Sequence, residues 1–172
     1  MRTHTIHIDD FHFEKAKRYA GKGTPGKLYY YKIFNFTRFT QEIWLPLLKN
    51  GILHKKLTLL DLKQDKYCLE KVFNIKFGDI VIFEGVFLFK EEFLPHFDLK
   101  MFLEVKKEEI MRRVVIRDTH ISKNDPQKIF ERYSQKYFAG QTIYLEKNNF
   151  WPKIDVIIDN NDFHDPKITK MA

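Results

Sequence analysis

The stretch DIVIFEGVFLF, residues 79–89, decides the fold class of this 172-residue sequence. The run is almost entirely apolar and is bounded by Gly78-Asp79 and Lys90. Glu84 is the one charged residue within it. A continuous apolar run of this kind is typical of a parallel strand that is covered on both faces. The stretch therefore predicts an inner strand of an α/β sheet that carries an acidic residue.

Segments of similar character recur along the chain, with helical patterns between them. Further strands are predicted at residues 3–8 (THTIHI), 55–62 (KKLTLLDL), 99–105 (LKMFLEV) and 154–160 (IDVIIDN). Helices are predicted at residues 37–50, where Pro46 favours a kink or an early end, at residues 106–120, and from Asp125-Pro126 onward. Strands that alternate with helices predict an α/β fold with a mainly parallel sheet, in a single domain spanning residues 1–172.

The net charge of +7 leaves three interpretations open: a solvated basic surface, phosphate binding by a few of the cations, and nucleic-acid binding. The Lys and Arg residues are spread without an uninterrupted run of five or more. No apolar run reaches the ~18 residues of a membrane span. Cys68 is the only cysteine, which excludes an internal disulfide and favours a reducing cytoplasm. We expect a cytoplasmic protein that binds neither membranes nor nucleic acids.

The glycine-rich stretch GKGTPGKL, residues 21–28, differs at its last position from a phosphate-binding loop, which ends in Gly-Lys-Ser/Thr. Such a loop joins a buried strand to the N-terminus of a helix. Here a charged segment, EKAKRYA, precedes the glycines and an aromatic, β-prone segment, LYYYKIF, follows them. Leu28 offers no hydroxyl for magnesium, and Pro25 removes a backbone amide. The stretch therefore predicts an ordinary surface turn.

Carboxylates stand at the ends of two predicted strands, with Asp9 and Asp10 after residues 3–8 and Glu84 within residues 79–89. In open parallel sheets, ligands bind at the carboxyl ends of the strands. One carboxylate there can hold a magnesium ion beside a nucleotide, and another can accept a proton from an attacking hydroxyl. The structural alternative stays open, since acids at strand ends also cap helices and form turns.

Three histidines, His4, His7 and His12, cluster near the first predicted strand. Their spacing suits no standard metal site, and no cysteine lies near them. We therefore do not assign a metal to these histidines.

The ordered set of motifs resembles the uridine kinase family of P-loop nucleoside kinases. The set consists of IHIDDFHF, KAKRY, DIVIFEGVFLF, DLKMFLEV, RRVVIRD, ERYSQKYFAGQTIY and IDVIIDN, and covers residues 4–162. It is most similar to a bacterial subgroup with IDDFH and FEGVFL motifs. The resemblance implies a three-layer fold with helices on both faces of a parallel sheet, and transfer of the γ-phosphate of ATP, with Mg²⁺, to a hydroxyl of a small acceptor.

The resemblance also implies roles for particular residues. Asp9 matches the general base of such kinases and can face the magnesium ion, while Glu84 matches a magnesium-associated carboxylate. Arg113 and Arg117 match lid arginines that close on the transferred phosphate. Positions four apart share a helix face, so two guanidiniums can act together there, although a solvated basic helix face is the structural alternative.

Substrate and nucleotide contacts follow from the same resemblance. Asp10, His12, Arg18 and Tyr30 are expected to contact the acceptor. Asn161 follows the last predicted strand, where the family binds adenine.

The sequence departs from the family in two respects. The histidine and the acid with which known members bind uridine have no counterpart in LTLLDLKQD (57–65) or near the tyrosine run 29–31, so another small hydroxylated acceptor fits equally well. The phosphate loop, with its strand and helix, precedes IDDF in the family but has no counterpart in the eight residues before Asp9.

The missing loop has two explanations: a truncated gene product, which we favour, or a kinase-derived remnant that acts as a non-catalytic binding or regulatory subunit. Removal of the loop's strand from such a sheet exposes neighbouring strand edges and apolar faces. We therefore expect Val81, Phe83 and Leu103 to be uncovered, with dimerisation or aggregation of the chain through these edges.

Overall fold

The computed structural model describes residues 1–122 and 125–171. Where the sequence predicts a single domain, the chain divides into two compact units, Met1–Leu88 and Phe89–Ala172. Each unit carries its own strand pairing and its own apolar core. The two units are therefore described separately.

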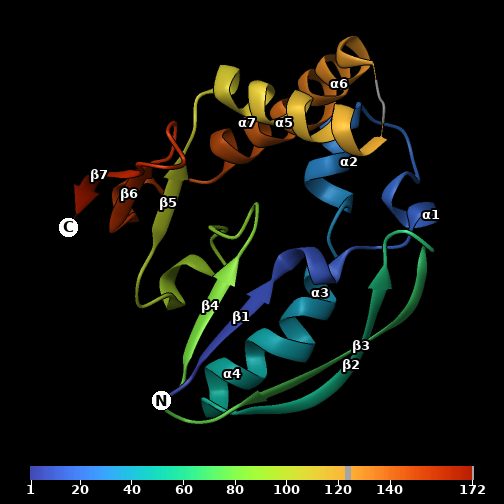
Figure 1. The fold of residues 1–172 in the computed structure, drawn as a ribbon. Coiled ribbons are helices and arrows are strands. Elements are labelled where there is room, and N and C mark those ends of the chain that lie inside the picture. Colours follow the sequence, from blue (N-terminus) through green and yellow to red (C-terminus); the bar gives the residue numbers. More distant parts are fainter. Residues whose placement is uncertain (123–124, 172) are drawn as a thin grey trace. The chain divides into compact units, whose positions relative to one another are not determined.

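The first unit combines four strands with short helices (Figure 1). Its elements are β1 (Thr3–His7), α1 (Lys15–Arg18), α2 (Pro25–Lys32), α3 (Phe36–Phe39), α4 (Leu45–Asn50), β2 (Leu53–Asp61), β3 (Lys66–Ile75) and β4 (Ile80–Glu84). Residues Ile8–Phe11 form a 3-10 helix directly after β1.

Strands β1 and β4 pair in parallel, with Thr3 opposite Ile80 and His7 opposite Glu84. The strand predicted at residues 79–89 is present but ends at Glu84, because Gly85 has a φ of 135° that leaves the extended region. This strand is also not covered on both faces, since Ile80 and Ile82 are exposed.

The prediction that three apolar residues are uncovered is correct for only one of them. Leu103 is exposed as expected, but Val81 and Phe83 are half-buried. The strand alternation turns Phe83 toward the neighbouring helical segment, where its ring lies 5.9 Å from that of Phe39 and 5.1 Å from that of Trp44.

Strands β2 and β3 form an antiparallel hairpin, drawn as the long ribbon in Figure 1. The strand predicted at residues 55–62 is confirmed as β2, but its partner β3 was not predicted. The sequence of β3, KYCLEKVFNI, mixes charged and apolar residues without regular alternation and is mostly exposed. Pairing with β2 rather than burial makes it a strand. The register shifts between Leu59 and Leu60, which leaves both leucines buried.

The helix predicted at residues 37–50 is interrupted as Pro46 suggests. A π-helical turn over Thr40–Trp44 separates α3 from α4, and Pro46 lies in the first turn of α4. The wider turn accommodates a residue that cannot donate a backbone hydrogen bond. Gly51 ends α4 with a φ of 64°, and its N–H donates to the Leu47 carbonyl at 2.7 Å.

The aromatic segment after the glycine-rich stretch is helical, which corrects the β-prone interpretation of LYYYKIF. Helix α2 begins at Pro25, a residue suited to the first turn, and the Thr24 hydroxyl accepts from the Lys27 N–H at 3.4 Å. These local signals at the N-terminus outweigh the weak helix propensity of three consecutive tyrosines. Residues 21–24 form the exposed bend before this helix.

Within residues 89–122 and 125–171, the second unit contains a small mixed sheet, three α-helices and short 3-10 helices at Leu94–His96 and Trp151–Lys153 (Figure 1). Its elements are β5 (Met101–Glu104), α5 (Lys107–Ser122), α6 (Pro126–Arg132), α7 (Ala139–Lys147), β6 (Val156–Asp159) and β7 (Lys167–Met171). Strands β5 and β6 pair in parallel, and β7 pairs antiparallel with β6. A π-helical segment, Tyr133–Phe138, joins α6 to α7.

The strands that the structure describes form three sheets, β1-β4, β2-β3 and β5-β6-β7, where the sequence predicts a single one. Strand type is well predicted by apolar patterns, whereas pairing depends on backbone partners far away in the sequence. In the ranges 1–122 and 125–171, no helix is both long and apolar enough to span a membrane.

Candidate functional site

The acidic pair of the first unit lies on the 3-10 helix that follows β1. Ile8 and Phe11 are three residues apart, and a 3-10 helix has three residues per turn, so both side chains fall on one side of it. Both are almost fully buried. This anchoring leaves Asp9 and Asp10 directed away from the core.

The second acidic segment is held against the first by a glycine. Gly85, directly after Glu84, has a φ of 135°, and a Cβ atom there would overlap the Cγ2 atom of Ile8. Only glycine therefore allows the end of β4 to approach the 3-10 helix so closely. This packing brings Glu84 and Asp9 to the same end of the β1-β4 pair.

The charges of this cluster influence one another. Burial by surrounding protein atoms raises the pKa of Asp9, and the negative charges of Glu84 and Asp10 raise it further, while His12 and His7 oppose the shift. Asp9 nevertheless keeps contact with solvent. The His7 Nδ1 hydrogen-bonds to Glu84 Oε1 across the two strands. The expected convergence of Asp9 and Glu84 is therefore present within this unit.

An open pocket of about 440 Å³ adjoins the acidic pair. Its lining comprises Asp9, Asp10, Leu59, Leu60, Asp61, Leu62, Lys63 and Leu69. The pocket thus lies between the 3-10 helix and the β2-β3 hairpin. Lys71 on the hairpin donates to Asp10 Oδ2 at 2.6 Å and fixes that carboxylate at the pocket's edge.

Asp61 differs from the other two acids of the pocket because its carboxylate is occupied by the hairpin turn. The backbone N–H groups of Lys63 and Gln64 donate to Asp61 Oδ1 at 2.8 and 3.2 Å, and they hold the pKa of Asp61 below its usual value. Asp61 therefore shapes the turn, and Asp9 keeps its carboxylate for other contacts.

Three further residues expected to contact the acceptor lie outside this pocket lining. His12 donates from Nδ1 to the Asp9 carbonyl at 2.5 Å, and its ring lies 4.7 Å from that of Phe34. Arg18 is 13% exposed and donates to Asp65 Oδ1 at 3.2 Å, which ties α1 to the hairpin turn. Tyr30 is buried against the rings of Tyr31 and Phe87. The contacts of Arg18 and Tyr30 are structural.

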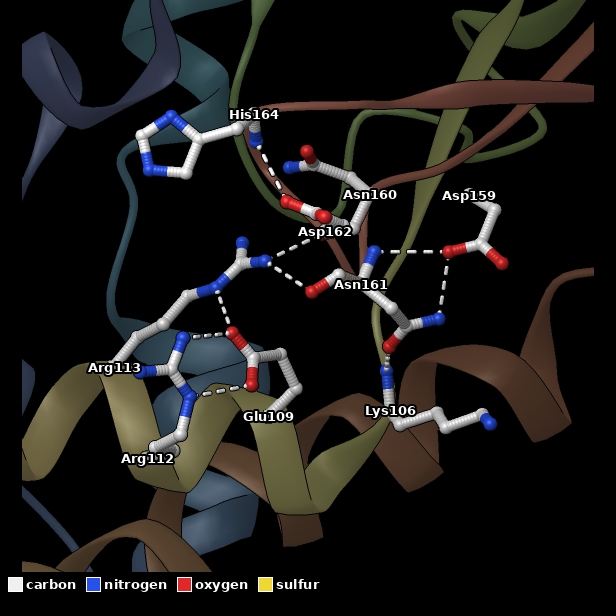
Figure 2. Close-up of polar contacts among 9 residues, drawn as sticks. All are labelled: Lys106, Glu109, Arg112, Arg113, Asp159, Asn160, Asn161, Asp162 and His164. Atoms are coloured by element: carbon white, nitrogen blue, oxygen red, sulfur yellow. Dashed lines mark hydrogen bonds and ion pairs between the residues drawn. The ribbon is translucent and has the colours of Figure 1, made fainter.

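In the second unit, Arg113 is held on three sides (Figure 2). Its Nε donates to Glu109 Oε1 at 2.6 Å, and its Nη2 donates to the carbonyls of Asn160 and Asn161 at 2.5 and 2.9 Å. Arg112 also pairs with Glu109, through two hydrogen bonds of 2.7 Å. These two guanidiniums lower the pKa of Glu109 to about 2. Arg113 therefore fastens α5 to the turn after β6.

The side chain of Asn161 is bonded at both ends within the same network (Figure 2). Its Oδ1 accepts from the Lys106 N–H at 2.8 Å, and its Nδ2 donates to Asp159 Oδ1 at 2.7 Å. Asn161 thus joins the ends of β5 and β6. An adenine at this turn would meet the turn's other groups rather than a free amide of Asn161.

Arg117 has a different environment from Arg113. Its Nε donates to Asp118 Oδ1 at 2.8 Å, and its Nη2 donates to the Tyr133 hydroxyl at 3.0 Å. Arg132 of α6 pairs with the other oxygen of Asp118. The two arginines that helical spacing groups together, Arg113 and Arg117, therefore have separate contacts.

Sequence reasoning missed several residues of these clusters. The hairpin residues Leu69 and Lys71 were missed because β3 lacks a strong apolar alternation. The polar residues 63–66, which follow the predicted strand 55–62, were nevertheless a usable hairpin signal. Glu109 and Arg132 look like ordinary charges on helical surfaces. Only the structure shows what each of them contacts.

The acidic cluster fits a magnesium ion only as part of a shared complex. Within residues 1–122 and 125–171, no group of three or more His, Cys, Asp or Glu side chains could hold a metal ion. Magnesium is commonly held by one or two carboxylates together with substrate phosphates and water. Asp9 and Glu84 would supply two such carboxylates.

The part of the chain that the structure describes contains no loop that could bind the phosphates of a nucleotide in the manner of a phosphate-binding loop. Helix α1, not a strand, precedes the glycine-rich stretch, and the Lys32 ammonium near it donates to the Ala20 carbonyl at 2.9 Å. No other glycine-rich segment joins a strand to a helix in these ranges. Among the described residues, the carboxylates could contribute to a metal site, whereas no segment forms a phosphate cradle.

Comparisons with known proteins identify the fold. No family model matches the chain, and no curated protein matches it. Among solved structures, the chain is similar to a possible uridine kinase from Bacillus stearothermophilus, with a TM-score of 0.69 and 22% sequence identity. The likeness covers 91% of this chain and 72% of that chain. At this identity it shows a shared α/β fold.

Proposed function

We propose that this chain is the acceptor-binding and lid portion of an ATP-dependent phosphotransferase of the nucleoside kinase type. The observation that carries the proposal is the parallel pairing of β1 with β4, which places Asp9 and Glu84 at one end of a strand pair beside a pocket. Ligands in α/β sheets gather at such ends. The fold likeness to a possible uridine kinase supports the same interpretation.

In the proposed reaction, Asp9 accepts the proton of the acceptor hydroxyl, and Asp10, held by Lys71, helps to orient the acceptor. Glu84 and Asp9 would hold Mg²⁺, which supplies positive charge against the phosphates. Arg117 is the lid arginine that the contacts leave most accessible for a phosphate, whereas Arg113 positions the turn after β6. The phosphate loop comes, in this proposal, from a segment outside residues 1–172.

The acceptor is a small hydroxylated molecule with an aliphatic face. Leucine side chains make up half of the pocket lining, and no aromatic side chain is part of it to stack on a base. A pyrimidine nucleoside is therefore one candidate among several. We place the protein in the cytoplasm, acting on small molecules rather than on nucleic acids or membranes, and expect its exposed strand residues such as Leu103 to favour self-association.

The proposal is tested with the chain joined to the segment encoded directly upstream, provided with ATP, Mg²⁺ and a panel of hydroxylated acceptors. We expect phosphorylated product by mass spectrometry, and a kcat lower by about 10²-fold or more in Asp9→Asn, since a positioned base contributes that much. Glu70→Gln, on the exposed face of β3, is the matched control and should retain full activity.

Two outcomes would contradict parts of this proposal. Full turnover by Asp9→Asn would remove Asp9 from the role of base. Robust phosphate transfer by residues 1–172 alone would show that no added phosphate loop is needed.

A non-catalytic binding subunit is the second candidate, and one observation favours it. All lining residues of the pocket belong to the first unit, whereas no phosphate cradle occurs among the described residues. Calorimetry with the acceptor panel in the absence of ATP separates the candidates: acceptor binding by a chain that stays inactive even when extended would support the binding subunit.

A further inference from the structure

A carboxylate of the second unit, Asp118, bridges two arginines that lie on different helices. Asp118 near the end of α5 accepts from Arg117 Nε through Oδ1 at 2.8 Å, and its Oδ2 pairs with Arg132 of α6. The Asp118 side chain is 15% exposed, whereas Arg117 and Arg132 are 58% and 41% exposed. The carboxylate thus lies beneath two cationic groups that reach solvent.

The net positive charge of this cluster can attract an anion. Two guanidiniums share one carboxylate, so the three side chains carry a net charge of +1. Each guanidinium has five N–H donors in a planar fork, which suits the oxygens of a phosphate. The Tyr133 hydroxyl accepts from Arg117, and burial raises the pKa of Tyr133, so its proton stays available for an anion.

The neighbouring arginines of α5 do not offer this arrangement. Figure 2 shows Arg112 and Arg113 both turned to Glu109, and Arg113 also bonded to backbone carbonyls that a mobile anion cannot replace. Glu109 therefore keeps these two guanidiniums in structural contacts. Arg117 and Arg132 are bridged by a carboxylate whose place an anion of the same shape and charge can take.

We infer that Arg117 and Arg132 form a binding site for a phosphate group, in which Asp118 is an internal competitor that the phosphate displaces. The inference rests on the proposed function for the identity of its ligand, which is the phosphate chain of the nucleotide. It adds Arg132, from a different helix, to the phosphate-binding set. It also gives Asp118 a regulatory role, since this carboxylate weakens phosphate binding until a phosphate replaces it.

The test uses the whole chain and inorganic tripolyphosphate as the probe, titrated by calorimetry at low ionic strength. We expect Arg132→Gln to weaken binding about tenfold, because a charge-assisted hydrogen bond is lost. Asp118→Asn should tighten binding by about fivefold, because the competing charge is removed while the side chain keeps its size. Arg112→Gln is the matched control, an exposed arginine on the same helix, and should leave binding unchanged.

Several outcomes would overturn the inference. Equal effects of Arg132→Gln and Arg112→Gln would mean that tripolyphosphate responds to net charge alone. Weaker binding by Asp118→Asn would mean that the carboxylate only organises the arginines. If Asp118→Asn loses helical content in circular dichroism, the comparison of Arg132→Gln with Arg112→Gln decides the question.

The probe also separates this inference from the proposed function. Tripolyphosphate binding requires neither an acceptor nor a phosphate transfer. If the extended chain transfers no phosphate while tripolyphosphate binding depends on Arg132, the proposed function fails and the site stands. If transfer occurs but Arg132→Gln leaves both binding and transfer intact, the inference fails alone.

Discussion

At the scale of single residues, two backbone or side-chain features hold the acidic cluster in place. Gly85 permits the close contact between the end of β4 and Ile8. Asp79 connects the starts of the same two strands: its Oδ1 accepts from the Arg2 N–H at 2.8 Å, and its Oδ2 bonds to His4 Nε2 at 3.0 Å. Each feature gives a prediction that can be measured without knowing the substrate.

Gly85→Ala should destabilise the protein by about 2–4 kcal/mol, because a positive φ is combined with an overlap against a β-branched neighbour. Gly78→Ala is the matched control: its φ is 84°, but nothing lies within 4 Å of the added Cβ. This control should lose only about 1 kcal/mol, from backbone strain. Urea unfolding of both variants measures the difference, and equal losses would contradict the packing role of Gly85.

Asp79→Asn should destabilise the protein at neutral pH, with a deficit that shrinks in acid. Donors from Arg2, His4 and Lys76 surround the carboxylate and lower its pKa well below the usual value. A lowered pKa in the folded state contributes stability above about pH 4, and this contribution is lost as the pH falls through the folded value.

Urea unfolding of wild type and Asp79→Asn across about pH 2 to 7 measures this effect, because the loss falls below about pH 4. Asp98→Asn, an exposed aspartate, provides the comparison. A deficit that stays constant over the whole range would show that the charge of Asp79 does not matter.

At the scale of elements, the turn after β6 depends on side chains from α5. Arg113 donates to two carbonyls of the turn, and Asn161 connects the turn to the N-terminal end of α5 through the Lys106 N–H. The negative charge of Glu109, retained over most of the pH range by its low pKa, keeps Arg113 in this position. The position of the turn is thus determined by packing between elements and not by its own sequence.

Arg113→Gln should therefore loosen this turn. Loss of donors to two partly buried carbonyls costs about 1–3 kcal/mol, and the amides of residues 160–164 should exchange hydrogen faster. Arg112→Gln removes an exposed partner of Glu109 alone and should cost less than about 1 kcal/mol. Hydrogen exchange with mass spectrometry measures both variants, and unchanged protection of the turn in Arg113→Gln would contradict this role.

At the scale of the whole molecule, the likeness to the solved structure of a possible uridine kinase and the division into two units are separate facts. The likeness extends over 91% of the chain and therefore includes both units. The cluster of Asp9 with Glu84 lies entirely in the first unit, and that of Arg117 with Arg132 lies entirely in the second. Each proposed site can thus be tested by itself.

Some of the fold and the site could be predicted from the sequence. The strands at residues 3–8, 55–62, 99–105 and 154–160 are present within a few residues, because their apolar patterns and β-branched residues favour extended backbone. The proximity of Asp9 to Glu84 was also expected, because parallel strands bring their carboxyl ends together. These inferences needed only local periodicity and one general rule of sheet geometry.

Other features were decided by tertiary structure. The strand pairing of β3 and the separate contacts of Arg113 and Arg117 are set by groups outside each segment. By itself, the sequence determined the position of the five predicted strands and which acids follow them, since these depend on neighbouring side chains. Strand partners and the partners of each arginine depend on groups that are distant along the chain, and only the folded molecule brings those groups together.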